Sequence, residues 1–452
     1  MVDDAHAPEG GELHRAIGGR MLIVFIVGDI LGAGIYGLVG KLSGQVGGMV
    51  WLPLAIGFAI AALTGASYAE LVGKYPRAAG AALYTHRAFG RPFITFLVAF
   101  AVMMSGVASA SAAAVLFGGK YLQELVAAPE MIAAFGFLAA ITLVNFIGIS
   151  ESIKVNFVLT LVEVLGLVVV MTLGVIGLIR GNGEPARAFV LDAPDGAFLG
   201  VLGATALGFY ALIGFEDSVN LAEECEEPSR TFPIALFTGI AITGVIYVIV
   251  SFVAVALVDP KVFASSSGPL LEVVKAAGVS FPPWLFAVIA LLAIGNTALI
   301  NMMMASRLMY GMANENIVPK VFARVHARRR TPWVAIVFTV AISGILIASG
   351  TAEDLAKTTV LLLLVVFAVV NVCVLVMRRR PVPHPHFRTP TWAPVIGLAT
   401  TLLLASPLTP GRPLRVYAIA GILVGVGAVL WGINRLLTGR RVTELDPEKL
   451  VK

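Results

Sequence analysis

Residues 28–37 read GDILGAGIYG, and this short stretch decides how the rest of the sequence is interpreted. It contains four glycines and lies inside an apolar run, residues 17–41, that is long enough to cross a membrane as a helix. Each glycine weakens a helix by up to ~1 kcal/mol. We therefore predict a transmembrane helix that is interrupted at Gly32, Ala33 and Gly34.

A second stretch of the same kind follows later in the chain. Residues 208–217 read GFYALIGFED and lie in the apolar run 197–222. Paired interruptions in two halves of a chain are typical of a transporter binding site. A broken helix exposes N–H groups that attract a carboxylate, and carbonyl groups that hold a cation or an ammonium group. The alternative is that glycines let helices pack closely, and we favour it for Gly28, Gly37 and Gly40.

The composition excludes several classes of protein. Of the 452 residues, 58% are hydrophobic and 13% are charged, and the mean hydropathy is +0.92. A soluble protein carries about 25% charged residues, so this chain has too little charge to cover the surfaces of soluble domains. A water-soluble enzyme, a secreted disulfide scaffold and a disordered regulator are therefore excluded, and we predict a polytopic membrane protein.

The apolar segments predict an all-α fold with about 12 transmembrane helices, because helices satisfy their own backbone hydrogen bonds in lipid. The segments do not alternate as the strands of a β-barrel would. The predicted spans are residues 17–41, 47–73, 92–118, 130–149, 154–179, 197–222, 233–258, 282–313, 333–350, 354–377, 391–407 and 414–437.

The distribution of basic residues predicts the orientation in the membrane. Of the 32 Lys and Arg residues, 23 fall on one side of the predicted spans and 9 on the other. The positive-inside rule then places both termini in the cytoplasm. This explanation is preferred over nucleic-acid binding for the net charge of +5.

Five motifs, in the order expected, resemble the amino acid–polyamine–organocation superfamily of permeases. Residues 32–36 read GAGIY, 210–216 read YALIGFE, 76–81 read PRAAGA and 306–310 read SRLMY. The fifth motif consists of Glu223, Glu224, Pro228, Arg230 and Pro233.

The resemblance implies a LeuT-like fold with five-plus-five inverted repeats and broken helices 1 and 6. It divides a single transmembrane domain, residues 1–452, into a cytoplasmic N-terminus, two repeats, a peripheral pair of helices and a cytoplasmic C-terminus. The corresponding ranges are 1–16, 17–180 for helices 1–5, 197–377 for helices 6–10, 391–437 for helices 11–12, and 438–452.

The resemblance also implies a substrate site at the two breaks. Residues that face the substrate carboxylate would be Ile30, Gly32, Ala33 and Gly34. Residues that face its ammonium group and gate the site would be Tyr210, Ala211, Ile213 and Gly214. Tyr210 stands where relatives have an aromatic lid, and the alternative is an aromatic residue that only packs.

Acidic residues inside the predicted spans are candidates for function, because a charge at the bilayer centre costs roughly 2.5–3.5 kcal/mol. Glu163 lies on one helix face with Asn156 and Thr160. Many relatives place a lysine at the position that we align to Glu163, so the lysine form of ion coupling is in doubt here. A glutamate could instead couple proton binding to transport, or it could be a neutral, hydrogen-bonded interior residue.

Two further acids flank the breaks. Asp29 precedes the first break, and Glu216 follows the second with Asp217 beside it. Asp29 and Glu216 are interpreted either as caps for the broken helices or as coupling and substrate contacts. Asp217 points about 100° away from Glu216 on a helix, so the two need not act together.

Polar residues in spans 3 and 8 complete the candidate set. Ser105 and Ser109 lie one turn apart in span 3, and relatives with cationic substrates often have an acid near the position of Ser105. Its absence favours a neutral or broadly accepted substrate. Thr297 and Asn301 share a face of span 8 and are expected to reach the first break. The alternative for this pair is hydrogen bonding between helices.

The function predicted from these residues is secondary active transport of amino acids across the plasma membrane by alternating access, as proton-coupled symport or exchange. The alternatives are a transporter of polyamines or other organic cations with the same fold, and, more distantly, an intramembrane enzyme. The expected partners are an amino acid or related amine, a coupling proton or sodium ion and the lipid bilayer, with no nucleic acid. No cofactor or metal is expected.

Overall fold

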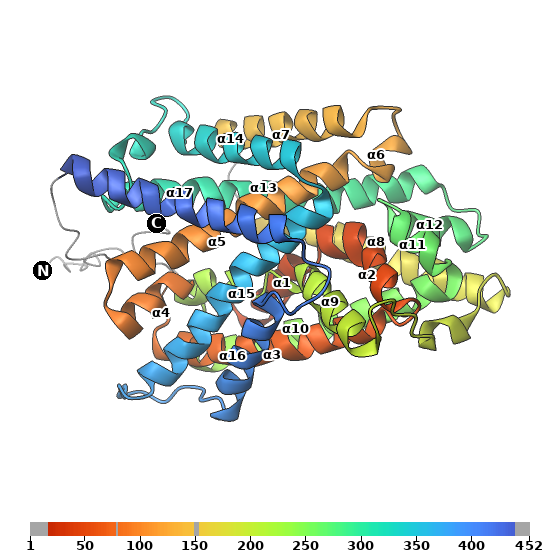
Figure 1. Cartoon of the computed structure of the whole chain (residues 1–452), viewed down its shortest axis with the longest axis horizontal. Helices are drawn as coiled ribbons and strands as arrows, with labels where there is room; N and C mark the ends of the chain where they lie inside the picture. Colours follow the sequence, from red (N-terminus) through yellow and green to blue (C-terminus); the bar gives the residue numbers. More distant parts are fainter. Residues whose placement is uncertain (1–16, 78–79, 149–152, 439–452) are drawn as a thin grey trace, which may run out of the picture.

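The computed structural model describes residues 17–77, 80–148 and 153–438, with side chains left out at 153–157 and 438. Within these residues the fold is built from helices and contains no β-strand. The helices of the membrane-spanning segments pack side by side, and most of them run along one axis of the molecule (Figure 1). They are α1 (Gly19–Ile30), α2 (Val39–Val46), α3 (Trp51–Lys74), α5 (Pro92–Phe117), α7 (Glu130–Ile147), α8 (Ile153–Ile179), α9 (Ala197–Gly208), α10 (Pro228–Leu257), α13 (Pro283–Asn314), α14 (Trp333–Ser349), α15 (Ala352–Met377), α16 (Trp392–Ala405) and α17 (Leu414–Thr438).

Short helical elements connect or interrupt the long ones. Four are α-helical: α4 (Gly80–Phe89), α6 (Lys120–Gln123), α11 (Pro260–Ser265) and α12 (Pro269–Ala276). The others are the π-helix η1 (Gly34–Leu38) and the 3₁₀ helices η2 (Pro185–Phe189), η3 (Phe209–Leu212), η4 (Asp217–Glu224) and η5 (Lys320–Ala323).

The predicted membrane spans are confirmed. In the described part of the chain, ten helical segments are long and apolar enough to cross a membrane, and the shorter apolar helices α14 and α16 add to them. Each segment coincides with a predicted span to within a few residues. Helices α4, α11 and α12 were not predicted, because they lie in the connections between spans and contain no long apolar run.

The contacts between helices follow a twofold pattern: where a span of the first five contacts a span of the second five, the two corresponding spans are also in contact. Helix α1 of span 1 packs on α10 of span 7, and α9 of span 6 packs on α3 of span 2. Likewise α8 of span 5 packs on α13 of span 8, and α15 of span 10 packs on α5 of span 3. Two repeats of five helices require this symmetry, while the predicted boundaries of the repeats stay a prediction.

Close packing is confirmed for the three glycines that we assigned to it. A Cβ atom at Gly28 would lie 2.1 Å from Oγ1 of Thr160, and one at Gly37 would lie 2.5 Å from the side chain of Leu116. A Cβ atom at Gly40 would lie 2.2 Å from the carbonyl oxygen of Phe263. These glycines let span 1 approach α8, α5 and the α11 segment.

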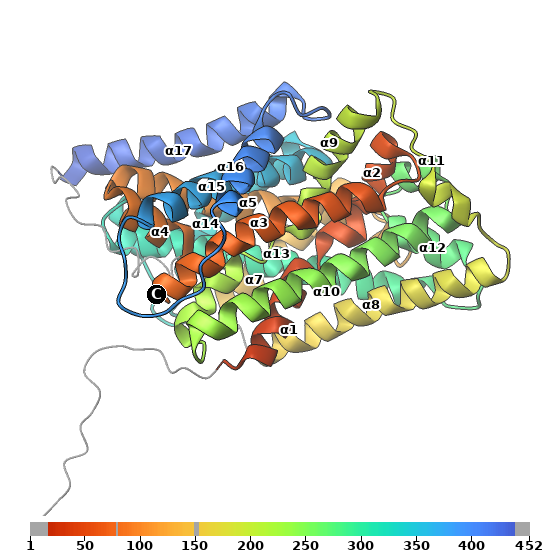
Figure 2. The ribbon, with the colours of Figure 1, turned by 90° about the horizontal axis from the view of Figure 1, so that it is seen from below.

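The two ends of the helix bundle carry different connections. Helix α4 contacts η4 at one end, which we call the α4 end. Helices α11 and α12 lie at the opposite end, which we call the α12 end (Figures 1 and 2). The basic loops that predicted the cytoplasmic side belong to the α4 end, since they include the residues that flank α4 and those that follow α13.

Candidate functional site

Span 1 loses its helix at the predicted position. Helix α1 ends at Ile30, and Leu31 has an extended backbone with φ −70° and ψ 129°. The chain then passes through Gly32 and Ala33 into the π-helix η1. The break predicted from the glycines of residues 28–37 is therefore confirmed.

Span 6 is broken in the same way. After η3, Ile213 is extended with φ −69° and ψ 145°, and Gly214 has φ 129°. A Cβ atom at Gly214 would lie only 2.4 Å from the carbonyl oxygen of Asp29. Both the positive φ and this close approach require glycine. The helical turn resumes at Asp217 in η4.

The two breaks meet in the middle of the bundle. Gly214 touches the backbone of Asp29 and Ile30, and a Cβ atom at Gly34 would lie 2.5 Å from Cα of Ala211. Elements η1 and η3 are therefore in direct contact, as are α1 and η4. Segments about 180 residues apart in the sequence thus bring their irregular backbone together.

Side chains of this chain satisfy several of the backbone groups that the breaks release. The amide of Ala33 donates to Oγ1 of Thr297 at 3.2 Å, and the carbonyl of Ile30 accepts from the hydroxyl of Tyr247 at 2.9 Å. The amide of Gly214 donates to Oε2 of Glu216 at 2.9 Å. Glu216 therefore pairs with an amide that the second break releases, and Thr297 contacts the first break, while their roles in coupling or gating stay predictions.

A cavity of about 140 Å³ lies next to the second break, toward the α4 end. Among the predicted site residues, Ser105, Ile213, Glu216 and Asn301 line it. The lining residues come from α3, α4, α5, the second break, η4, α13 and α15: Tyr68, Gly80, Ala81, Ala82, Ala99, Val102, Met103, Ser105, Gly106, Ser109, Ile213, Glu216, Asp217, Asn220, Asn301, Met304, Ala305, Arg307, Leu308, Thr359 and Leu363.

Most residues predicted to contact the substrate lie at the breaks, outside the cavity wall. They are buried in contacts within the chain: Ile30, Gly32, Ala33, Gly34, Tyr210, Ala211 and Gly214. Their role in substrate binding stays a prediction. In this conformation Gly34 and Ala211 close the space between the two breaks, and Ile213 is the break residue that faces the cavity.

A family model for amino acid permeases matches residues 17–429. The chain belongs to the amino acid permease family. It is therefore a transporter, and the alternative of an intramembrane enzyme is wrong.

Similar proteins agree with this assignment. An uncharacterised transporter of Mycobacterium tuberculosis is 29% identical, over 96% of this chain and 94% of its own length. The branched-chain amino acid permease BcaP of Bacillus subtilis is 27% identical, over 94% of this chain and 95% of its own length. The cationic amino acid transporter 9 of Arabidopsis thaliana is 28% identical, over 70% of this chain and 58% of its own length.

In this permease, Glu163 is buried between spans 5, 1 and 8. Its side chain is 1% exposed, and its Oε1 accepts from Nδ2 of Asn296 at 3.1 Å. Its backbone carbonyl accepts from the hydroxyl of Tyr36 at 2.6 Å. One helical turn earlier, Thr160 packs against Gly28 of span 1. The polar face predicted for span 5 is thus turned into the bundle, while the side chain of Asn156 lies outside the described residues.

Two carboxylate oxygens in the permease core are buried without a hydrogen-bond partner among the described residues. They are Oε2 of Glu163 and Oδ2 of Asp29. Leaving a buried polar group unpaired costs about 1–3 kcal/mol, and more for a charged group. Within the described residues, no group of three or more His, Cys, Asp or Glu side chains gathers at either atom.

Tyr210 is held against span 3. Its hydroxyl lies 3.2 Å from Oγ of Ser109 and donates to the carbonyl of Ser109 at 3.3 Å. The side chain is 6% exposed, so it packs between spans 3 and 6 as the packing alternative predicts. A role as a lid over the substrate stays a prediction.

Asn301 lies one turn beyond Thr297 and makes a different contact. Its amide donates to the carbonyl of Thr297 at 2.9 Å, and its side chain lines the cavity near Gly106. The expectation that Asn301 reaches the first break is not met by any of its hydrogen bonds among the described residues. The reason is that one helical turn carries it about 5.4 Å along α13 toward the α4 end.

Several residues of the cavity wall were not predicted from the sequence. Tyr68, Thr359 and the start of α4 at Gly80 line the cavity together with Arg307. Tyr68 follows Ser67 in α3 and Thr359 follows Thr358 in α15, and neither pair forms a pattern that predicts a site. Gly80 and Arg307 belong to the motifs PRAAGA and SRLMY, which indicated the family but not a place in the cavity wall.

Proposed function

We propose that this permease is a secondary active transporter that moves amino acids across the cell membrane by alternating access. The observation that carries the proposal is the meeting of two broken helices beside a cavity at the α4 end. Main-chain groups at such breaks suit the two charged ends of an amino acid. In the proposed orientation both termini and the α4 end face the cytoplasm, because 23 of the 32 basic residues lie on that side.

The proposed architecture is two inverted repeats, residues 17–180 and 197–377, followed by the helix pair in residues 391–437. Five spans per repeat place corresponding helices in opposite directions across the membrane. The exchange symmetry of the helix contacts supports this division. The breaks in spans 1 and 6 then occupy equivalent positions, and the substrate sits between the repeats.

Glu163 is proposed as the residue that couples a proton to transport. It lies beside span 1 through Tyr36 and beside span 8 through Asn296, so it touches helices from both repeats. Its second oxygen has no partner among the described residues, which leaves a place for a proton. Binding of a proton would neutralise the carboxylate and would therefore change the packing of spans 1, 5 and 8.

Uptake by the purified permease in liposomes tests the proposal. A panel of labelled neutral and cationic amino acids is offered with and without a pH gradient, and a sodium gradient is imposed in parallel. We expect uptake of at least one amino acid that increases with an inward proton gradient. Failure to take up any amino acid would contradict the proposed function.

The variant Glu163→Gln sharpens the test of coupling. We expect its uptake to lose the response to the pH gradient while exchange of internal for external substrate continues. Glu130→Gln is the matched control, since Glu130 is an exposed glutamate at the start of α7. Gradient-driven uptake that survives in Glu163→Gln would contradict the role of Glu163.

A second substrate class is favoured by the acidic residues of the cavity. Glu216 and Asp217 both line it, and carboxylates attract the ammonium groups of polyamines and other organic cations. Putrescine and spermidine therefore belong in the uptake panel. Uptake of these amines without uptake of amino acids would select this alternative.

A further inference from the structure

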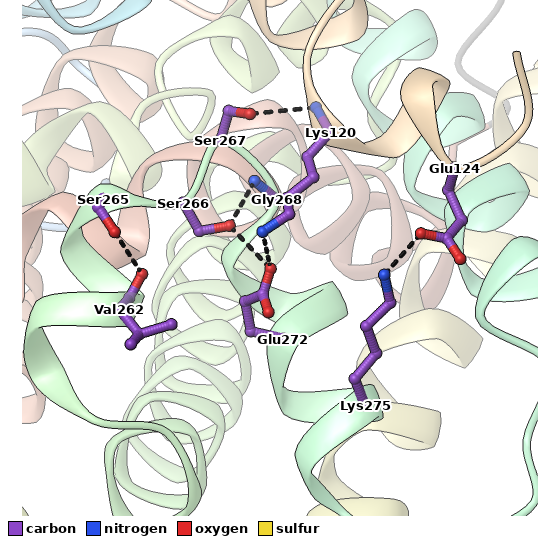
Figure 3. A network of polar contacts seen from close by, with 9 residues as sticks. All are labelled: Lys120, Glu124, Val262, Ser265, Ser266, Ser267, Gly268, Glu272 and Lys275. Carbon is purple, nitrogen blue, oxygen red and sulfur yellow. Dashed lines mark hydrogen bonds and ion pairs between the residues drawn. The ribbon is translucent and has the colours of Figure 1, made fainter. Parts of the chain in front are cut away.

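The α12 end of the permease is closed by a polar network that the function described so far does not use. It joins α6, the extension of span 3, to α12 in the connection between spans 7 and 8 (Figure 3). Lys120 on α6 pairs with Glu272 on α12. Lys275 on α12 pairs with Glu124 at the end of α6, with 2.6 Å between Nζ and Oε2.

The four charges are arranged so that only one register of the two helices is attractive. Along α6 the basic residue comes first and the acidic residue follows, whereas along α12 the acidic residue comes first. Sliding one helix past the other would bring Lys120 toward Lys275 in one direction, or Glu124 toward Glu272 in the opposite direction. Like charges brought together in this way disfavour the wrong arrangement.

Hydrogen bonds and glycines bring the same two elements into contact. The amide of Lys120 donates to Oγ of Ser267 at 3.1 Å, and Oγ of Ser266 donates to Oε1 of Glu272 at 3.2 Å. A Cβ atom at Gly119 would lie 3.0 Å from Oγ of Ser267, so the loop before α12 lies directly on the start of α6. The ion pairs thus stand at the edge of a closely fitted contact.

This contact covers the first broken helix. Helix α12 packs on η1, the segment that follows the break in span 1. On the α6 side, the hydroxyl of Tyr121 donates to the carbonyl of Tyr36 in η1 at 2.6 Å. No residue of η1, α6 or α12 lines the cavity described above. The breaks are therefore covered at the α12 end, and the cavity lies on their α4 side.

We propose that Lys120, Glu124, Glu272 and Lys275 are gate residues of the transport cycle. Their two ion pairs hold α12 on α6 while the cavity is available at the α4 end, and both pairs separate when the α12 end opens. The inference rests on the proposed function, because alternating access requires the covered end to open. Since the four side chains are 16–41% exposed, the pairs are weak enough to break in each cycle.

The opening of the gate can be measured as the labelling rate of a cysteine that the closed gate buries. Leu271 is fully buried on α12, so Leu271→Cys is introduced into a chain whose two native cysteines, Cys225 and Cys373, are replaced by alanine. The rate of reaction with a membrane-impermeant maleimide added at the α12 side is then measured in liposomes. Labelling proceeds only while the gate is open.

We expect Lys120→Gln, Glu272→Gln, Lys120→Glu and Glu272→Lys each to raise the labelling rate by about 2- to 5-fold. The double swap of Lys120→Glu with Glu272→Lys restores attraction and returns the rate to that of the parent chain. Lys261→Glu is the matched control, because Lys261 is an exposed basic residue of α11 at the same end, and it leaves the rate unchanged.

Transport gives a second readout that a purely structural contact would not change. Opening the gate enlarges the population that binds external substrate, so the apparent KM for uptake falls by about the same factor as labelling rises. Labelling rates that are equal in the parent chain and in all single variants would overturn the gate, as would failure of the double swap to restore the rate. If the parent chain takes up no substrate while labelling responds as expected, the proposed function fails and the gate stands.

Discussion

The two broken helices meet at the same place but are stabilised differently. In span 1, side chains from other helices satisfy the released groups: Thr297 on α13 binds the amide of Ala33, and Tyr247 on α10 binds the carbonyl of Ile30. In span 6, Glu216 binds the amide of Gly214 from two residues away. The first break therefore depends on the position of α10 and α13, whereas the second carries its own cap.

This difference matters for transport. A break held by distant helices should change its hydrogen bonds when those helices move, so we expect span 1 to respond to changes in the packing of the bundle. A break with a local cap should keep its shape during such movement, and Ile213 and Glu216 of this break line the cavity. The four predictions that follow test this contrast, from the largest expected effect to the smallest.

Substitution of Gly214 should have the largest effect. Gly214→Ala places a Cβ atom at φ 129° and 2.4 Å from the carbonyl of Asp29. Strain of this kind costs about 1–3 kcal/mol before the backbone overlap is added. We expect loss of folded protein, measured by size-exclusion chromatography and thermal unfolding in detergent. The control Gly196→Ala also has a positive φ but meets no atom within 4 Å, and we expect it to fold.

Gly34→Ala tests the contact between the breaks. The Cβ atom of this alanine would lie 2.5 Å from Cα of Ala211. Because Cα is a backbone atom, no side-chain rotation can relieve the overlap. Overpacking of this kind costs about 1–3 kcal/mol. We expect folded protein with uptake reduced at least about 10-fold, because the overlap forces the two breaks apart. Gly44→Ala in the same span makes only an ordinary contact at 3.7 Å and should retain uptake. Normal uptake by Gly34→Ala would show that the breaks need not touch.

Two variants of Glu216 distinguish the effect of its hydrogen bond to Gly214 from the effect of its charge. Glu216→Gln keeps an oxygen for the amide of Gly214 and removes the charge, while Glu216→Ala removes both. Leaving a buried amide unpaired costs about 1–3 kcal/mol, so we expect the alanine variant to unfold at a clearly lower temperature than the glutamine variant. Equal unfolding temperatures would show that the cap does not stabilise the second break.

Thr297→Val should have the smallest effect of the four. It removes the hydroxyl that binds the amide of Ala33 and keeps the shape of the side chain. A hydrogen bond contributes about 0.5–1.5 kcal/mol, so we expect a several-fold reduction in uptake with the fold retained. Thr243→Val is the control, because the hydroxyl of Thr243 is buried and donates within its own helix. If both variants transport equally, the first break does not depend on α13.

The membrane spans and the breaks could be predicted from the sequence, while the cavity could not. Residues 28–37 and 208–217 carry a local signal, since clustered glycines weaken the helix in which they lie. The cavity wall contains Tyr68, Thr359 and the start of α4, each an ordinary residue in its own segment. Their common location depends on how α3, α4, α5, α13 and α15 pack around the second break and η4. The family resemblance implied a substrate site at the two breaks, which stays a prediction, and it did not predict that the chain itself fills the space between Gly34 and Ala211.

Two properties of this chain follow from its sequence alone: it is a helical membrane protein, and two of its helices break at glycine-rich stretches. Both properties are local, because hydropathy acts on runs of about 20 residues and glycine acts on its own backbone. The tertiary structure decided which groups satisfy the breaks, where the cavity lies and which end is covered. These properties depend on partners as distant as Ala33 and Thr297, 264 residues apart, and packing brings such residues together without leaving a pattern in either segment.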